Sequence, residues 1–135
     1  MREIKFKIWD KQGNKFLESY DDGYVKIEYV LNTKGELFEW IESSEGGGDF
    51  MNELEQKNFI ITQYTGVKDK RGKEIYEGDI VILNDSEEEY KCVVKYKYGS
   101  YILENRYFTE QLSNCEERFL EVIGNIYENR ELLEE

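Results

Sequence analysis

Three glycines at intervals of six residues, Gly66, Gly72 and Gly78, constrain the fold of this chain more than any other feature. They lie within the segment Gln63 to Leu83, which begins after one apolar run (59–61) and ends in another (80–83). Glycine adopts backbone conformations that other residues avoid, so polar stretches built around it commonly form sharp turns. The interval therefore predicts closely spaced strands joined by tight turns.

A second pattern, Asp or Asn followed three residues later by Gly, occurs at residues 10–13, 32–35 and 69–72. Asp at the first position and Gly at the fourth favour a type I turn, with Gly supplying the positive φ of the following bulge. Residues 21–23 form a further Asp-Asp-Gly turn. Proline is absent, so every sharp turn must use Gly, Asn or Asp.

Apolar residues alternate with polar ones between these turns, which is typical of strands with one wet face. The abundance of aromatic residues, with eleven Tyr, seven Phe and two Trp, also favours β structure. Residues 106–117 have no clean periodicity and receive no assignment. The predicted strands cover residues 4–8, 15–18, 25–31, 37–41, 91–98, 101–103 and 120–123.

These patterns predict a mainly β fold: a small antiparallel curved sheet or an SH3-like partly open barrel, with N-terminal β-hairpins and one or two short helices. The 135 residues suit a single domain. Within it we expect a hairpin region at 1–58, a barrel-like region at 59–127 and a C-terminal helix at 129–135.

The short helices are expected at two places. Residues 50–57 can form a helical turn or two with Asp49 as N-cap, and Asn129 can cap the C-terminal helix, which would place Leu132 and Leu133 against the body. The glycine-rich stretch Ser43 to Asp49 is either a hinge or a long surface loop.

The formal net charge of −12 argues against direct nucleic-acid binding, which draws much of its affinity from cations that neutralise phosphates. With two Cys and no His, the chain cannot supply four Cys or His ligands to a zinc ion, and we expect no metal and no cofactor. No apolar run is long enough to span a membrane, and the N-terminus lacks a signal-peptide pattern. We therefore expect a cytoplasmic protein with reduced cysteines.

The central segment Q-Y-T-G-V-K-D-K-R-G-K-E-I-Y-E-G-D-I-V resembles the signature of the YopX family of phage and prophage proteins. The start, R-E-I-K-F-K-I-W-D, and the end, E-V-I-G-N-I-Y-E-N-R-E-L-L, resemble the first strand and the closing strand and helix of that family. Arg130 stands where the family commonly has proline, which weakens the helix start slightly. Because the family is biochemically uncharacterised, the resemblance implies only a phage-encoded protein that acts in a bacterial cytoplasm.

The candidate interaction surface is the dense group of cations at the tip of the central hairpin, together with one aromatic residue. It comprises Tyr64, Lys68, Lys70, Arg71 and Lys73. The sequence suggests no catalytic pair of a nucleophile and a general base, and His, the usual general base, is missing from the chain. We therefore expect a non-enzymatic interaction protein that binds a host or phage protein.

Two alternatives remain open. The acidic surface can imitate nucleic acid and block a host DNA-binding protein, or Glu74, Glu77 and Asp79 can hold a metal ion in a carboxylate-based enzyme. A structural role competes with the metal-site alternative: Gly78 can take a positive φ while Asp79 accepts backbone N–H groups at the turn.

Self-association as a dimer or trimer is also expected. Residues 25–31 and 37–41 carry apolar side chains on both faces, and a small open sheet leaves edge strands that need cover.

Overall fold

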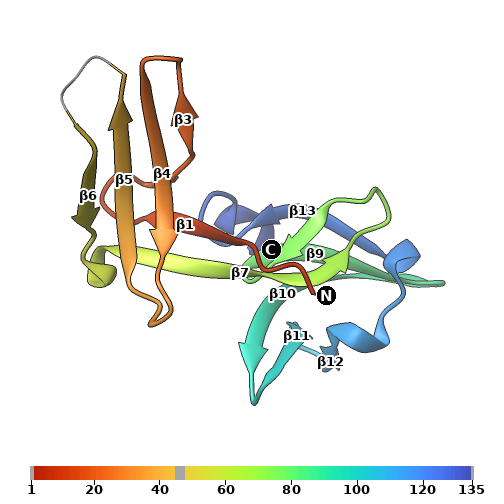
Figure 1. Ribbon diagram of the computed structural model, residues 1–135. Helices are drawn as coiled ribbons and strands as arrows, with labels where there is room; N and C mark the ends of the chain where they lie inside the picture. The colour runs from red at the N-terminus through yellow and green to blue at the C-terminus, as the bar shows by residue number, and fades with distance from the viewer. Residues whose placement is uncertain (1, 45–47, 135) are drawn as a thin grey trace. The chain divides into compact units, whose positions relative to one another are not determined.

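The computed structural model describes residues 2–44 and 48–134 and shows a mainly β protein (Figure 1). Strands account for 55% of the described residues and helices for 10%, and every helix described is a short 3-10 turn. The prediction of a mainly β, antiparallel fold is confirmed. The strands are β1 (Phe6–Asp10), β2 (Lys15–Phe16), β3 (Tyr20–Asp21), β4 (Val25–Leu31), β5 (Leu37–Ser43), β6 (Phe50–Glu53), β7 (Phe59–Lys68), β8 (Glu74–Tyr76), β9 (Asp79–Asp85), β10 (Glu88–Lys97), β11 (Ser100–Glu104), β12 (Thr109–Gln111) and β13 (Leu120–Asn125). The 3-10 turns are η1 (Gln56–Asn58), η2 (Leu112–Asn114), η3 (Glu117–Phe119) and η4 (Arg130–Leu133).

The chain separates into two compact units. The N-terminal unit is Ile8–Ile61, and the C-terminal unit combines Met1–Lys7 with Thr62–Glu135. A sheet with the order β3-β4-β5-β6 belongs to the first, and a sheet with the order β12-β11-β10-β9-β13 belongs to the second. A third sheet has the order β2-β1-β7-β8, and its strands β1 and β7 contribute residues to both units.

The five-stranded sheet of the C-terminal unit curls into a half-barrel around the hydrophobic core. Alternate residues of neighbouring strands meet on its inner face, as in the pairs of Cys92 with Val81 and of Val94 with Leu103. The buried core residues are Ile75, Val81, Cys92, Val94, Leu103, Leu112 and Leu120. Period-two alternation in four strands thus produces one continuous apolar interior.

The three central glycines all adopt a positive φ. The φ angles of Gly66, Gly72 and Gly78 are 87°, 81° and 84°. Gly66 lies where the register of β7 against β8 shifts, Gly72 ends the turn that joins these strands, and Gly78 joins β8 to β9. The prediction of closely spaced strands joined by tight turns is confirmed at Gly72 and Gly78, whereas Gly66 lies inside the ten-residue strand β7, at an irregularity of the pairing.

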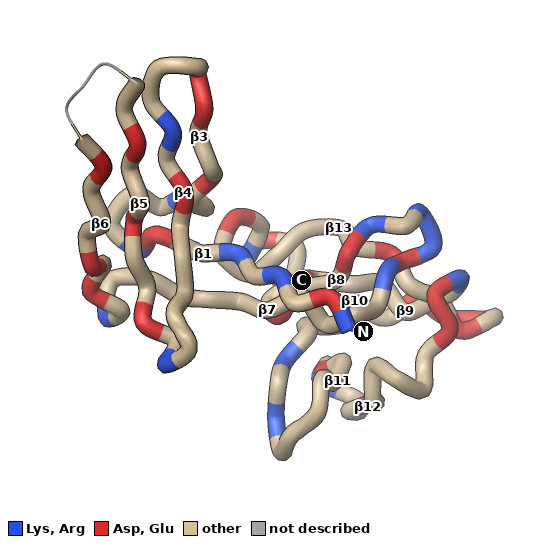
Figure 2. Tube along the Cα trace, viewed as in Figure 1, with Lys and Arg blue, Asp and Glu red and all other residues tan. Residues whose placement is uncertain are grey.

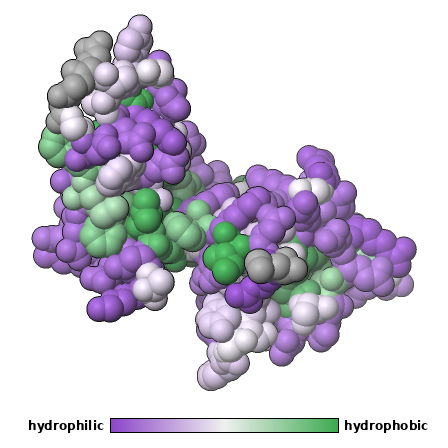
Figure 3. Space-filling model, in the orientation of Figure 1, coloured by the Kyte–Doolittle hydropathy of each residue, from purple (hydrophilic) through white to green (hydrophobic). Residues whose placement is uncertain are grey.

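The sheet of the N-terminal unit is less deeply buried. Leu37 of β5 is fully buried, but most other residues of β4 and β5 are only partly covered on either face. One face carries Val30 paired with Phe38, and Trp40 paired with Met51. Figure 3 shows hydrophobic residues exposed among hydrophilic ones over this unit. The prediction that both faces carry apolar side chains holds for the folded sheet.

Two local predictions in this unit are wrong. Residues 50–53 form edge strand β6, not a helical turn with Asp49 as N-cap, and η1 alone is helical there. An isolated short helix is marginal, whereas an edge strand gains a hydrogen-bonded ladder with β5. At residues 10–13, the positive φ of 53° falls on Asn14 instead of Gly13.

The C-terminal helix is shorter than predicted and lacks the expected cap. It is the 3-10 turn η4, and the side chain of Asn129 makes no capping hydrogen bond to it. Its Oδ1 instead accepts the backbone N–H of Asn125 at 3.2 Å. Leu132 is partly buried and Leu133 is exposed. Of the Ser43 to Asp49 stretch, residues 45–47 lie outside the described residues, so the choice between hinge and loop stays open.

Candidate interaction surface

The turn from Asp69 to Gly72 is held by a buried carboxylate at its first position. Asp69 Oδ1 accepts the backbone N–H groups of Arg71 and Lys73, each at 2.9 Å, and the N–H of Gly72 donates to the Asp69 carbonyl. Asp69 Oδ2 accepts the N–H of Val122 in β13, also at 2.9 Å. Both oxygens are therefore used, and the second fastens the turn to a strand 53 residues away.

Asp69 is only 3% exposed, yet it is charged at neutral pH. Burial by itself raises the pKa of this carboxyl, but the backbone N–H groups of Val122, Lys73 and Arg71 outweigh that effect and lower the pKa below its usual value. A carboxylate that accepts several N–H bonds is strongly favoured in its ionised form. The turn is thus anchored from inside the protein.

Four cations project from this anchored turn and its flanks. Lys68, Lys70, Arg71 and Lys73 are all exposed, and Figure 2 shows the blue cluster that they form at one loop. Lys70 and Arg71 both contact the Glu121 carboxylate, at 3.0 and 3.1 Å. Within residues 2–44 and 48–134, Lys68 and Lys73 have no ion-pair partner at salt-bridge distance.

Tyr64, the fifth residue of the predicted surface, lies inside the unit. It is 5% exposed, and its ring centroid is 5.5 Å from that of Tyr76 in the neighbouring strand. Burial raises the pKa of Tyr64 above its usual value. The exposed surface therefore consists of the four cations, which we call the cationic turn.

The three carboxylates proposed as metal ligands each have a separate structural partner. Glu74 contacts the Lys5 ammonium at 2.8 Å, and Glu77 Oε1 accepts the N–H of Gln63 at 3.1 Å. Asp79 Oδ2 accepts the N–H of Tyr76 at 2.8 Å, next to the positive φ of Gly78. The turn role predicted for Asp79 is confirmed.

Asp79 is also the most perturbed buried carboxyl of the described chain. Burial raises its pKa to about 6, against the opposing effects of the Tyr76 N–H and of Lys7 and Lys73. Among residues 2–44 and 48–134, no group of three or more His, Cys, Asp or Glu is arranged to hold a metal ion. No helix in that part of the chain is long and apolar enough to cross a membrane. Cys92 and Cys115 are both free thiols.

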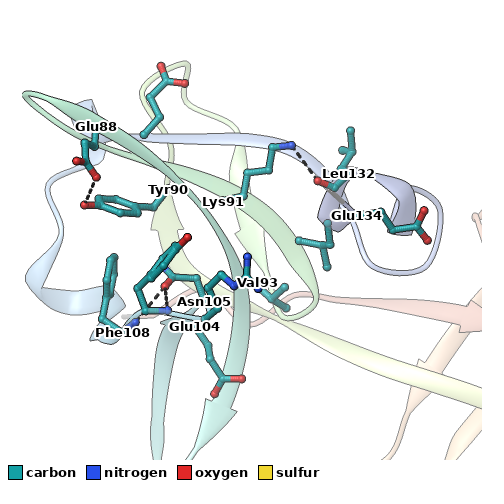
Figure 4. A pocket seen from close by; sticks show the side chains of 13 residues that line it. Glu88, Tyr90, Lys91, Val93, Glu104, Asn105, Phe108, Leu132 and Glu134 are labelled. Carbon is teal, nitrogen blue, oxygen red and sulfur yellow. Dashed lines mark hydrogen bonds between the residues drawn. The ribbon is translucent and has the colours of Figure 1, made fainter.

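Sequence reasoning missed a groove of about 940 Å³ in the C-terminal unit. Its residues come from β10, from the 104–108 loop and from the end of η4. Figure 4 shows Tyr90 and Phe108 on one side of β10 and Leu132 and Glu134 on the other. Residues 106–108 of this loop lie in the stretch that received no assignment, and the available signal was Asn105 just before it, a residue that favours side-chain-capped turns.

Comparison with known proteins places this architecture in a family. The model of the family described as YopX protein matches residues 5–134, which is nearly the whole chain. The chain belongs to the YopX family. The resemblance that the central segment carries is thereby confirmed, together with those of both ends.

Two solved structures are similar to this chain over nearly its full length. Protein EF1440 from Enterococcus faecalis shares 26% identity at a TM-score of 0.62, covering 99% of this chain and 100% of that one. Protein yopX from Bacillus subtilis, a structural genomics target, shares 24% identity at a TM-score of 0.65, covering 99% of this chain and 100% of that one. No curated protein matches this chain.

Proposed function

We propose that this YopX family member is a non-enzymatic protein that binds another protein, of phage or host origin, in a bacterial cytoplasm. The contact is made by the cationic turn, and the partner presents an acidic patch. The observation that carries this proposal is the buried Asp69 carboxylate, which holds the turn with both of its oxygens.

Anchoring matters because an ordered loop loses little conformational freedom when it binds. Lys68 and Lys73 are exposed cations without an ion-pair partner in the described chain, so an incoming carboxylate displaces only water from them. Lys70 and Arg71 share Glu121, and one carboxylate between two cations leaves donors available. Partner carboxylates would therefore find four cations on a scaffold already in its bound shape.

The absence of catalysis is part of the same proposal. It is supported by the carboxylates nearest the turn, because Glu74, Glu77 and Asp79 accept from a Lys ammonium or from backbone N–H groups. These contacts give each of the three carboxylates a role in the fold.

The test is affinity capture from lysogenic or infected cells, followed by binding measurements with the purified partner. One variant carries Lys68→Gln, Lys70→Gln, Arg71→Gln and Lys73→Gln. The control carries Lys11→Gln, Lys15→Gln, Lys34→Gln and Lys57→Gln, which removes the same charge from exposed sites of the N-terminal unit.

We expect the turn variant to weaken binding at least about tenfold while the control stays near wild type. Equal losses in both variants, or a loss in neither, would overturn the role of the turn. Circular dichroism melts of all three proteins exclude unfolding as the cause.

Self-association as a dimer or trimer belongs to the same proposal. It is supported by the partly exposed apolar face of β4 to β6, where Val30, Phe38 and Trp40 are incompletely covered and Met51 is 52% exposed. Light scattering on a size-exclusion column should give a multiple of 16.2 kDa. A strictly monomeric mass at tens of micromolar protein would refute it.

A further inference from the structure

We infer that the groove beside β10 binds a protein segment that combines apolar side chains with Lys or Arg. This site is separate from the cationic turn and does not depend on the function proposed above. It lies within the C-terminal unit, and its chemistry is opposite in sign to that of the turn.

One wall of the groove is aromatic and held in place by the interior. Asn105 Oδ1 accepts the N–H groups of Tyr107 and Phe108 at 2.7 and 3.0 Å, and Asn105 Nδ2 donates to the buried Cys92 Sγ at 3.4 Å. The Tyr90 ring centroid lies 5.0 Å from that of Phe108 and 6.5 Å from that of Tyr107. Tyr107 is nevertheless 72% exposed, so a fixed aromatic ring faces solvent.

The opposite wall of the groove is aliphatic, and the polar residue Lys91 separates it from the aromatic wall. Leu132 and Leu133 line the groove from η4, and the Lys91 ammonium donates to the Leu132 carbonyl at 2.9 Å (Figure 4). Two apolar patches on either side of β10 suit an extended chain with two apolar side chains. Side chains two residues apart on such a chain lie about 7 Å apart on the same face.

The charges of the groove select a cationic segment. Four carboxylates and two cations line it. Both cations are already engaged, Lys91 with the Leu132 carbonyl and Arg106 over the Tyr107 ring at 5.8 Å. The Glu89 and Glu134 carboxylates have no hydrogen-bond or ion-pair partner among the described residues. An incoming Lys or Arg therefore meets unpaired carboxylates, whereas an incoming carboxylate meets only cations that are already engaged.

The experiment uses three capped pentapeptides as probes, titrated into the full-length isotope-labelled protein and followed by NMR. The first is Lys-Leu-Lys-Phe-Lys, the second Glu-Leu-Glu-Phe-Glu and the third Lys-Gly-Lys-Gly-Lys. We expect the first to shift the signals of Tyr107, Phe108 and Leu132, and to bind at least about tenfold more tightly than either of the others.

Two variants locate the binding. Tyr107→Ala should weaken the first peptide about tenfold, whereas Tyr24→Ala, which removes a Tyr of similar 64% exposure in the N-terminal unit, should leave it unchanged. Glu89→Gln combined with Glu134→Gln should weaken binding about threefold to tenfold and reduce its dependence on salt.

Several results would overturn the inference. They are equal affinity for the first two peptides, shifts spread over other acidic parts of the surface, or no difference between Tyr107→Ala and Tyr24→Ala. Groove signals that move with protein concentration alone would mean that a second copy of the chain occupies the site, which also overturns it.

Discussion

The two principal sheets of this protein are built from similar alternating strands, yet only one of them encloses a core. In the C-terminal unit, seven apolar side chains are essentially inaccessible to solvent inside the curled five-stranded sheet. In the sheet of β3 to β6, Leu37 alone of the described residues reaches that burial, and both faces stay partly wet. Alternation is therefore enough to form a strand, but a deep interior also requires that one face of the sheet be covered, which here the curvature of the sheet helps to achieve.

The same contrast holds for two turns of almost identical chemistry. In the N-terminal unit, Asn32 Oδ1 accepts the N–H groups of Lys34 and Glu36, each at 2.9 Å, just as Asp69 Oδ1 accepts those of Arg71 and Lys73. Asn32 is exposed, whereas Asp69 is buried and its second oxygen binds Val122. The two turns have the same local hydrogen bonds, but only the buried Asp69 turn also binds a distant strand.

The largest expected effect separates the cores. Leu103→Ala should lower the free energy of unfolding by about 3–5 kcal/mol, because it leaves a cavity in a fully buried site. Leu31→Ala, in the partly exposed strand β4, should cost only about 1 kcal/mol. Urea unfolding followed by circular dichroism measures both, and similar costs would mean that the two sheets are equally well packed.

The next effect separates the turns. Asp69→Ala removes the carboxylate that accepts three backbone N–H groups and leaves the partly buried Val122 N–H unpaired, so we expect a loss of about 2–4 kcal/mol. Asn32→Ala should cost about 1 kcal/mol because water can replace its side chain at an exposed turn. Hydrogen exchange at Val122 should accelerate only in the Asp69 variant. Equal losses at the two turns would contradict the long-range role of Asp69.

A third prediction concerns pH, since the buried carboxylates of the described chain, Asp69 and Asp79, both lie in the C-terminal unit. Burial raises the pKa of Asp79 to about 6, above the value of about 3.9 for an unfolded Asp, so the folded state binds the proton more tightly. The contribution of Asp79 to stability is therefore fully present below about pH 4 and is lost as the pH rises to about 6.

Asp79→Asn cannot titrate, and its side-chain oxygen can still accept the Tyr76 N–H. Its stability relative to wild type should increase by about 2 kcal/mol between pH 4 and pH 7. Taking the difference between the two proteins cancels the opposite contribution of Asp69, whose lowered pKa makes stability fall in acid. A difference that does not change with pH would refute the assignment.

The smallest effect distinguishes two glycines with nearly the same backbone. Gly35 in the N-terminal unit has a φ of 77° and open space around it, so Gly35→Ala should cost about 1 kcal/mol through backbone strain alone. At Gly78, with a φ of 84°, an added Cβ would lie 2.8 Å from Cε2 of Tyr127, and Gly78→Ala should cost about 1 kcal/mol more. Thermal melts of both variants check this, and an equal cost would show that the Tyr127 ring moves freely.

The amino-acid sequence by itself determined most of the strands, most of the turns and the family. The turns could be predicted because the side-chain bonds within an Asp or Asn turn, as at Asn32 and Asp69, close within five residues, so the nearby sequence is enough to specify them. Alternation likewise reports which side chains of β10 face inward, because the period of a strand is a local property.

Only the tertiary structure decided what those elements do for one another. Edge strand β6 replaced a weak helix because β5 offered it a ladder, and the Asn129 side chain bonded to Asn125 instead of capping η4. Tyr64 turned inward from the predicted surface, and Asp69 reached Val122 across 53 residues. Contacts between residues so far apart in the chain depend on the path of the whole backbone, which local propensity does not encode.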